Sequence, residues 1–145
     1  MNILAAVDLS PGSEKVTDTA GRLAKLMDAK VYVLHVAEPE PDFVGYDAGP
    51  EVVRTQVAEE LHREHRAVQS LAGRLRDSDV DATALLIRGP TVETTLKEAS
   101  SLRAGLIVVG SHGHGAVYDV LVGSYSAGII RRSKLPVLVV PVRES

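Results

Sequence analysis

The chain has 145 residues, of which 45% are hydrophobic and 24% are charged, and its formal net charge is −3. This composition excludes a disordered chain and a bundle of membrane helices, and it predicts a single domain over residues 1–145. The negative charge and the aromatic content of 3% argue against nucleic acid as a partner, because strand binding needs a basic field and stacking surfaces.

The lack of cysteine excludes disulfides, thiolate metal sites and a cysteine nucleophile. Met1 to Val7 run directly into an apolar stretch, with no basic segment and no cleavage site. No apolar run in the sequence reaches membrane-spanning length. We therefore expect a cytoplasmic protein that does not associate with membranes.

Short apolar runs alternate with longer amphipathic segments along the chain. Continuous apolar runs predict buried strands at residues 3–7, 31–36, 82–87, 106–109 and 136–141. The first helix is predicted to follow Ser10 as N-cap, with Pro11 at the first helical position. Apolar positions at helical spacing predict further helices over residues 51–76, around 92–99 and from near Ser124. Residues 38–50 are rich in proline, glycine and acidic side chains and are interpreted as a long loop, a lid or a variable connection.

Strands that alternate with helices predict an α/β fold with a doubly wound parallel sheet, covered by helices on both faces. In such a sheet the ligand lies beyond the carboxyl ends of the strands, where the direction of winding reverses. For five strands in the order 3-2-1-4-5, this point falls between the first and fourth strands. Asp8 and Ser10 follow the first of these strands, and the segment 110–115 follows the other. The sequence therefore predicts a ligand site built from two separate segments.

The segment 110–115 reads Gly-Ser-His-Gly-His-Gly, and Gly123 precedes the helix that is predicted to begin at Ser124. Glycine has no Cβ, so its backbone can approach a phosphate closely and turn N–H groups toward it. The start of the next helix adds further N–H donors and a partial positive charge. The hydroxyl groups of Ser124 and Ser126 are further donors. This pattern indicates an anion site that holds a polyphosphate by backbone groups.

Two common nucleotide motifs do not fit this loop. A P-loop would end in Gly-Lys-Ser/Thr, and the dinucleotide fingerprint would follow the first strand. The spacing glycine, two residues, glycine, nine residues, glycine, serine resembles the ATP-binding branch of the universal stress protein family, at Gly110, Gly113, Gly123 and Ser124. The resemblance covers nearly the whole chain. It includes the segments Val-Asp-x-Ser at 7–10, Leu-His-Val at 34–36 and Leu-Pro-Val-Leu-Val-Val at 135–140.

This resemblance implies a Rossmann-like fold, similar to that of adenine nucleotide alpha hydrolases, with strand order 3-2-1-4-5. It also implies ATP, with or without Mg²⁺, at the point where the winding reverses. Asp8 and Ser10 would border the ribose and phosphates, and Val36 would contact adenine. His114 stands where many relatives carry a basic residue, so its help with phosphate charge would depend on pH. The remaining implied site residues are Gly110, Gly113, Gly115, Val122, Gly123, Ser124 and Ser126.

These assignments have plainer alternatives. Asp8 caps the turn after the first strand in one interpretation, and Ser10 caps the helix. The glycines of segment 110–115 are ordinary turn residues in another. His112 and His114 resemble a metal pair, but no further ligand stands at suitable spacing, so we predict no metal site. We also predict no catalytic residue.

Other charged residues are assigned to the surface. Arg131, Arg132 and Lys134 fall near the end of the last predicted helix, where cations complement the helix dipole. His62 and His65 fall on the long charged helix and are interpreted as solvated. We assign none of these five residues to the ligand site.

The last predicted strand indicates that the protein forms a dimer. Val137 to Val140 would leave apolar side chains and unpaired backbone groups exposed at the edge of the sheet. Pairing with a second copy would satisfy both, and the resemblance implies the same dimer. We therefore predict a symmetric homodimer through this strand.

The leading functional hypothesis is an ATP-binding regulatory protein of the stress response, in which hydrolysis is slow or absent. The word stress rests on the resemblance alone, and the sequence names no protein partner. One alternative is a nucleotide-dependent enzyme, either a slow ATPase or an adenylyl transferase. Adenylyl transfer calls for a Ser-Gly-Gly-x-Asp loop after the first strand, where this chain reads Ser10-Pro11-Gly12-Ser13-Glu14. A second alternative is an interaction module with a vestigial nucleotide site.

Overall fold

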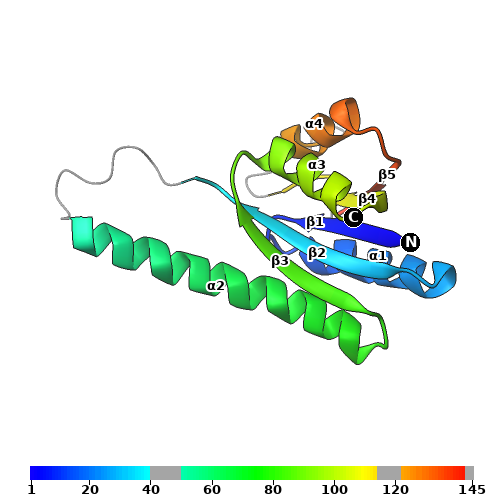
Figure 1. The fold of residues 1–145 in the computed structure, drawn as a ribbon, viewed down its shortest axis with the longest axis horizontal. Coiled ribbons are helices and arrows are strands. Elements are labelled where there is room, and N and C mark those ends of the chain that lie inside the picture. Colours follow the sequence, from blue (N-terminus) through cyan, green and yellow to red (C-terminus); the bar gives the residue numbers. More distant parts are fainter. Residues whose placement is uncertain (40–49, 114–121, 143–145) are drawn as a thin grey trace.

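Five parallel strands form one sheet, and helices lie on both sides of it (Figure 1). The computed structural model describes residues 1–39, 50–113 and 122–142. The strand order is β3-β2-β1-β4-β5, and all four neighbouring pairs are parallel. The strands are β1 (Asn2–Val7), β2 (Lys30–Ala37), β3 (Ala82–Arg88), β4 (Ala104–Gly110) and β5 (Val137–Val140). The predicted doubly wound α/β fold and its strand order are confirmed, with β5 at one edge.

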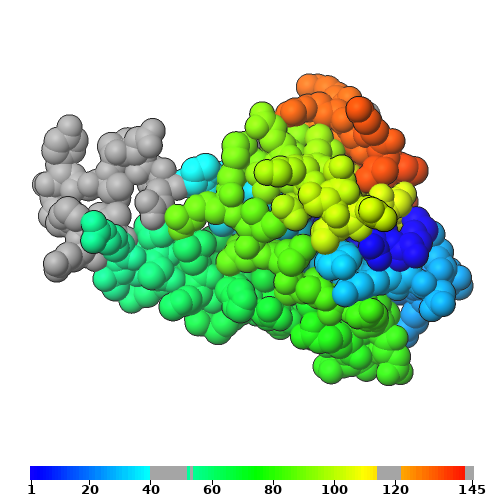
Figure 2. Space-filling view, viewed as in Figure 1, coloured from blue at the N-terminus to red at the C-terminus, as the bar shows by residue number. Residues whose placement is uncertain are grey.

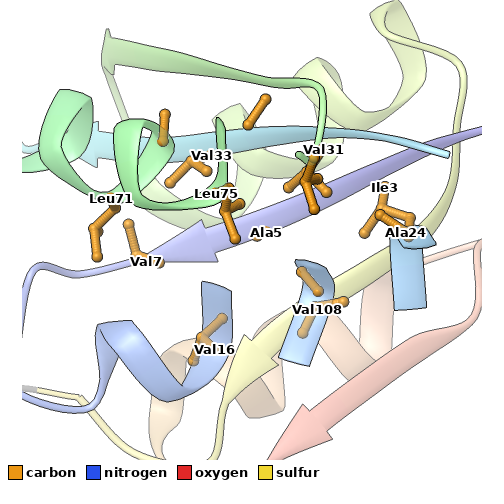
Figure 3. Packing of buried hydrophobic residues seen from close by; sticks show 14 of the residues in the cluster. Ile3, Ala5, Val7, Val16, Ala24, Val31, Val33, Leu71, Leu75 and Val108 are labelled. Carbon is orange, nitrogen blue, oxygen red and sulfur yellow. The ribbon is translucent and has the colours of Figure 1, made fainter. Parts of the chain in front are cut away.

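Four helices cover the two faces of this sheet. They are α1 (Ser13–Met27), α2 (Pro50–Asp77), α3 (Thr91–Ser101) and α4 (Ser124–Arg132). Side chains of β1 alternate between the two layers, as the pleat requires. Ile3, Ala5 and Val7 pack with α1 and α2, as Figure 3 shows beside Val16 and Leu75. The intervening residues of β1 pack on the other face, against α3 and α4.

The start of α1 differs from the prediction. The helix begins at Ser13 with Gly12 as N-cap, and no side chain caps it, so Ser10 is not the N-cap. The Asp8 carboxylate accepts a hydrogen bond from the Ser10 N–H at 2.9 Å, and the Ser10 carbonyl accepts one from the Ser13 N–H at 3.0 Å. These two bonds form a turn before the helix, because an aspartate side chain competes well for backbone N–H groups nearby.

The long helix α2 extends past the carboxyl ends of the strands, as Figure 1 shows. Its second half is held by Val68, Leu71 and Leu75, which are buried against the sheet. In Figure 2, α2 in green forms one margin of the molecule, while α4 and β5 in orange and red form the opposite one. The predicted range of 51–76 agrees with the observed helix to within one residue at each end. Most of the predicted loop, residues 40–49, lies outside the described residues.

No helix in the described part of the chain is both long and apolar enough to cross a membrane.

Candidate functional site

A cleft of about 1340 Å³ opens at the carboxyl ends of the strands. Its walls come from the loops after β1 and β4, the ends of β2 and β3, and the start of α4. A further wall, called here the α2 wall, comprises Gln56, Val57, Glu60, Leu61 and Glu64. The sheet reverses its winding between β1 and β4, so the cleft lies at the place where doubly wound sheets hold ligands.

The structure brings nine of the eleven predicted site residues to this cleft. Its lining includes Asp8, Ser10, Val36, Gly110, Gly113, Val122, Gly123, Ser124 and Ser126. The other two, His114 and Gly115, lie outside the described residues. Three segments far apart in the sequence therefore converge on this cleft.

The loops after β1 and β4 touch where Asp8 meets Gly113. One Asp8 oxygen accepts the hydrogen bond from Ser10, and the other lies where a Cβ on Gly113 would stand. Any side chain at position 113 would displace this carboxylate. The plainer role predicted for Asp8, capping the turn, is therefore confirmed, while the same side chain also faces the cleft.

Ser111 joins the ends of the loop that follows β4. Its carbonyl accepts a hydrogen bond from the Gly123 N–H at 2.7 Å, and its own N–H donates to Val140 at 2.9 Å. Its buried hydroxyl accepts a hydrogen bond from the Val142 N–H at 3.2 Å and lies 3.0 Å from Nδ1 of His112. These hydrogen bonds therefore hold the two ends of the loop, at Ser111 and Gly123, together. The sequence did not indicate this role of Ser111, because its backbone partners Gly123, Val140 and Val142 are 12 to 31 positions away.

The start of α4 is open toward the cleft. Its N-cap, Gly123, has extended backbone (φ −68°, ψ 166°), and no side chain caps the helix. Ser124 is exposed, whereas the buried Ser126 hydroxyl donates to the Gly110 carbonyl at 2.5 Å. Uncapped N–H groups at a helix start attract anions. The hydroxyl of Ser126 holds the end of β4 to the first turn of α4 by its bond to the Gly110 carbonyl.

Tyr125 anchors this helix start from behind. Its hydroxyl lies 2.5 Å from Oγ1 of Thr95 on α3. Burial raises the pKa of Tyr125 to about 12, the Thr95 hydrogen bond opposes this rise, and the Asp8 charge adds to it. The phenol is therefore neutral over the physiological range and holds α4 against α3.

Charged side chains that sequence reasoning left out of the site also line the cleft. Arg88 is the last residue of β3, and Arg131 lies in the last turn of α4. His35 and Glu64 form a close pair with 3.3 Å between Nε2 and Oε2. Strand alternation could have indicated His35, because it shares a sheet face with the buried Val31 and Val33. His62 and His65 are exposed on α2, as predicted.

Metal ligands do not gather in the part of the chain that the structure describes. Across residues 1–39, 50–113 and 122–142, no three histidine or carboxylate side chains come close enough to hold an ion.

Comparisons with known proteins agree with this architecture. A model of the Universal stress protein family matches residues 1–141. A universal stress protein of Thermus aquaticus is 31% identical over 138 residues, which cover 95% of this chain and 96% of the relative.

Three solved structures show the same fold. That of UspA from Lactobacillus plantarum superposes with a TM-score of 0.82 at 21% identity and covers 97% of each chain. A universal stress protein in complex with cAMP gives 0.69 at 22% identity and covers 99% and 98%. One from Archaeoglobus fulgidus in complex with dAMP gives 0.67 at 20% identity and covers 97% of each. From the family match and the Thermus relative, this chain belongs to the universal stress protein family.

Proposed function

We propose that the cleft binds ATP, with or without Mg²⁺, and that the protein is a nucleotide-binding regulator of the stress response. The observation that carries this proposal is the convergence of nine predicted site residues on one cleft beside an uncapped helix start. Two similarly folded proteins are described in complex with adenine nucleotides, cAMP and dAMP. They support a nucleotide of this class as the ligand.

The phosphates occupy the loop after β4. Gly110, Gly113 and Gly123 line the cleft, and the first N–H groups of α4 lie beside them with the hydroxyl of Ser124. Arg131 and Arg88 contribute positive charge to the same cleft. His114 and Gly115, which lie outside the described residues, belong to the same loop in this proposal.

The adenosine occupies the end of the cleft near β2. Val36 lies at the carboxyl end of this strand, and Val57 and Leu61 of the α2 wall provide apolar surface opposite it. Asp8 and Ser10 border the ribose between the two ends. An apolar wall with a few polar groups is the usual lining of a small-molecule site.

Hydrolysis is expected to be slow or absent in this proposal. Adenylyl transfer is disfavoured separately, because the loop after β1 lacks the Ser-Gly-Gly-x-Asp sequence that this reaction calls for. The binding and turnover measurements below distinguish a regulator from an enzyme and from an interaction module with a vestigial site. A cytoplasmic location remains a prediction.

The first test is release of any co-purified small molecule by denaturation, followed by calorimetric titration of the emptied protein with ATP and Mg²⁺. We expect either adenine nucleotide in the released fraction or micromolar binding. Product formation during prolonged incubation would favour the enzyme alternative. Neither nucleotide nor binding would overturn the proposal and favour an interaction module.

The proposed assembly is a homodimer through β5. This strand lies at the edge of the sheet, and Leu138 on it is 36% exposed, whereas Val137 and Val139 pack against the core. Leu138→Lys is therefore expected to convert dimer to monomer in sedimentation while the fold survives. Val139→Lys is expected to lower stability as well, because it places a charge against the core. A Leu138→Lys protein that still sediments as a dimer contradicts this interface.

A further inference from the structure

His35 forms two polar contacts between the sheet and the long helix. Its Nδ1 lies 2.9 Å from the carbonyl oxygen of Val7, at the end of β1. Its Nε2 lies 3.3 Å from Oε2 of Glu64 on the α2 wall. The two side chains are only 12% and 20% exposed. Glu64 Oε2 is itself buried and accepts no well-aligned hydrogen bond among the described residues, so its charge contact with His35 is its main compensation.

The geometry determines where the imidazole carries hydrogen. A carbonyl oxygen has no hydrogen to donate, so Nδ1 of His35 must be the donor to Val7. In a neutral ring Nε2 would then present a lone pair to the Glu64 carboxylate, which is repulsive. The contact is favourable only when one proton lies between Nε2 and Oε2, as in an imidazolium paired with a carboxylate. The formed pair therefore contains one more proton than the separated neutral histidine and carboxylate.

This pair lies directly beside the proposed ligand site. Val7 precedes Asp8, His35 precedes Val36, and Glu64 belongs to the α2 wall that faces them. The first part of α2 extends past the strand ends (Figure 1), whereas its second half is held against the sheet by Val68, Leu71 and Leu75. A contact at Glu64 thus sets how closely the wall approaches β2.

We propose that His35 and Glu64 are a positioning pair that shares one proton and holds the α2 wall against the cleft, so that nucleotide binding tightens as pH falls. The part that concerns affinity rests on the proposed nucleotide function. Neither residue contacts the reacting or binding groups of the ligand in this proposal. Their effect is transmitted through the distance between α2 and β2.

Other charged groups line the same cleft as the pair. Asp8 after β1, Glu38 after β2 and Glu60 on α2 are acidic, whereas Arg88 at the end of β3 and Arg131 on α4 are basic. As pH rises and the shared proton leaves, the pair is lost and the wall is released.

The test compares the ATP affinity of the wild type with that of Glu64→Ala and His35→Asn by calorimetry, from about pH 6 to about pH 8.5, the range in which histidine titrates. Alanine is used at position 64 because a glutamine amide could donate to Nε2 of a neutral His35. Asparagine keeps a donor near the Nδ1 position for Val7 but cannot reach Glu64. Near pH 6 we expect both variants to bind roughly three- to tenfold more weakly than the wild type. At high pH the difference should vanish. Taking the ratio at each pH removes the titration of the phosphates themselves.

The matched control is Glu59→Ala, which removes the same charge from an exposed position on the same helix. It should bind like the wild type at every pH. The double variant should be no weaker than either single variant, because one contact is lost in all three. A variant-to-wild-type ratio that does not change with pH, or an equal loss in Glu59→Ala, overturns the proposal.

A second measurement separates this proposal from the nucleotide proposal. Amide hydrogen exchange of residues 56–64, taken without nucleotide, should be faster in Glu64→Ala than in Glu59→Ala near pH 6 and equal at high pH. If the wild type binds no nucleotide but shows this difference, the proposed function fails and the pair stands as a positioning device. If exchange is the same in both variants at all pH values, the pair does not hold the wall and the inference fails.

Discussion

Helices α1 and α4 both follow loops at the ligand edge of the sheet, yet their first turns differ. The first residue of α1, Ser13, is 5% exposed, and its hydroxyl is buried without a hydrogen-bond partner in the described residues. The N-cap Gly12 is so close to Val142 that a Cβ there would lie 2.8 Å from the valine Cβ. The first residue of α4, Ser124, is exposed, and a Cβ on its N-cap Gly123 would have ordinary contacts of 3.5 Å.

This difference shows that a helix dipole alone does not make an anion site. Neither helix has a side-chain cap at its N-terminus, so the first turns of both carry a similar partial positive charge. Gly12 and Ser13 also line the cleft, but Val142 packs tightly against this start of α1, the closed end, and Ser13 is buried. The start of α4, the open end, lines the cleft with the exposed Ser124. Packing therefore decides which of two similar helix starts can receive a phosphate.

The largest effect is expected from a side chain at the open end. Gly113→Ala places a Cβ on the Asp8 carboxylate, which is held by Ser10, and so it disturbs both loops of the cleft. We expect ATP affinity to fall by at least about tenfold in calorimetry, the cost of misplacing charge-assisted hydrogen bonds. Gly73→Ala on α2 is the control, because its Cβ would have only a 3.7 Å contact. Unchanged affinity in Gly113→Ala would show that the loop is not the phosphate site.

At the closed end, an added methyl should act on stability. Gly12→Ala forces Val142 to move, and Val142 is bonded through its N–H to Ser111. We expect a loss of about 1–3 kcal/mol in urea unfolding, which is typical of overpacking. Gly73→Ala should instead be neutral or stabilising by up to about 1 kcal/mol. If Gly12→Ala is as stable as the wild type, the start of α1 is less tightly packed than the comparison requires.

Removing one hydroxyl from each helix start compares the two ends directly. Ser124→Ala should weaken ATP binding by about three- to tenfold, because it deletes a donor at the open end. Ser13→Ala should leave binding unchanged, and stability should stay equal or rise slightly, since a buried hydroxyl without a partner is removed. Equal losses of affinity in the two variants would mean that the ligand also reaches α1.

The smallest effect at neutral pH is expected from Tyr125→Phe, which removes the hydrogen bond to Thr95 behind the open end and costs about 1 kcal/mol. The pKa of this phenol is about 12 in the folded protein, against 10 for an ordinary tyrosine. Because the folded state holds the proton more tightly, the contribution of this group is complete below pH 10 and is lost as pH rises through 12.

The measurement is the free energy of unfolding by urea at several pH values in that alkaline interval. The wild type should lose stability more steeply with pH than Tyr125→Phe. Parallel curves for the two proteins would show that the phenol is not buried as described.

Local patterns in the sequence predicted the elements that depend on near neighbours. Apolar runs indicated the strands, helical spacing indicated α2 to within a residue at each end, and the glycine spacing indicated the loop before Ser124. These features follow from periodicity and backbone freedom, which a few adjacent residues decide. The start of α1 was predicted two residues too early, at Pro11 and not at Ser13, because the side chain of Asp8 forms a turn with Ser10 before the helix.

Only the tertiary structure decided what depends on contacts between distant segments. The approach of Asp8 to Gly113 joins two loops more than a hundred residues apart, and the pairing of His35 with Glu64 joins a strand to a helix. Both α1 and α4 begin without a side-chain cap at the ligand edge of the sheet. Burial separates them, and burial is a property of how remote surfaces pack, which no local pattern contains.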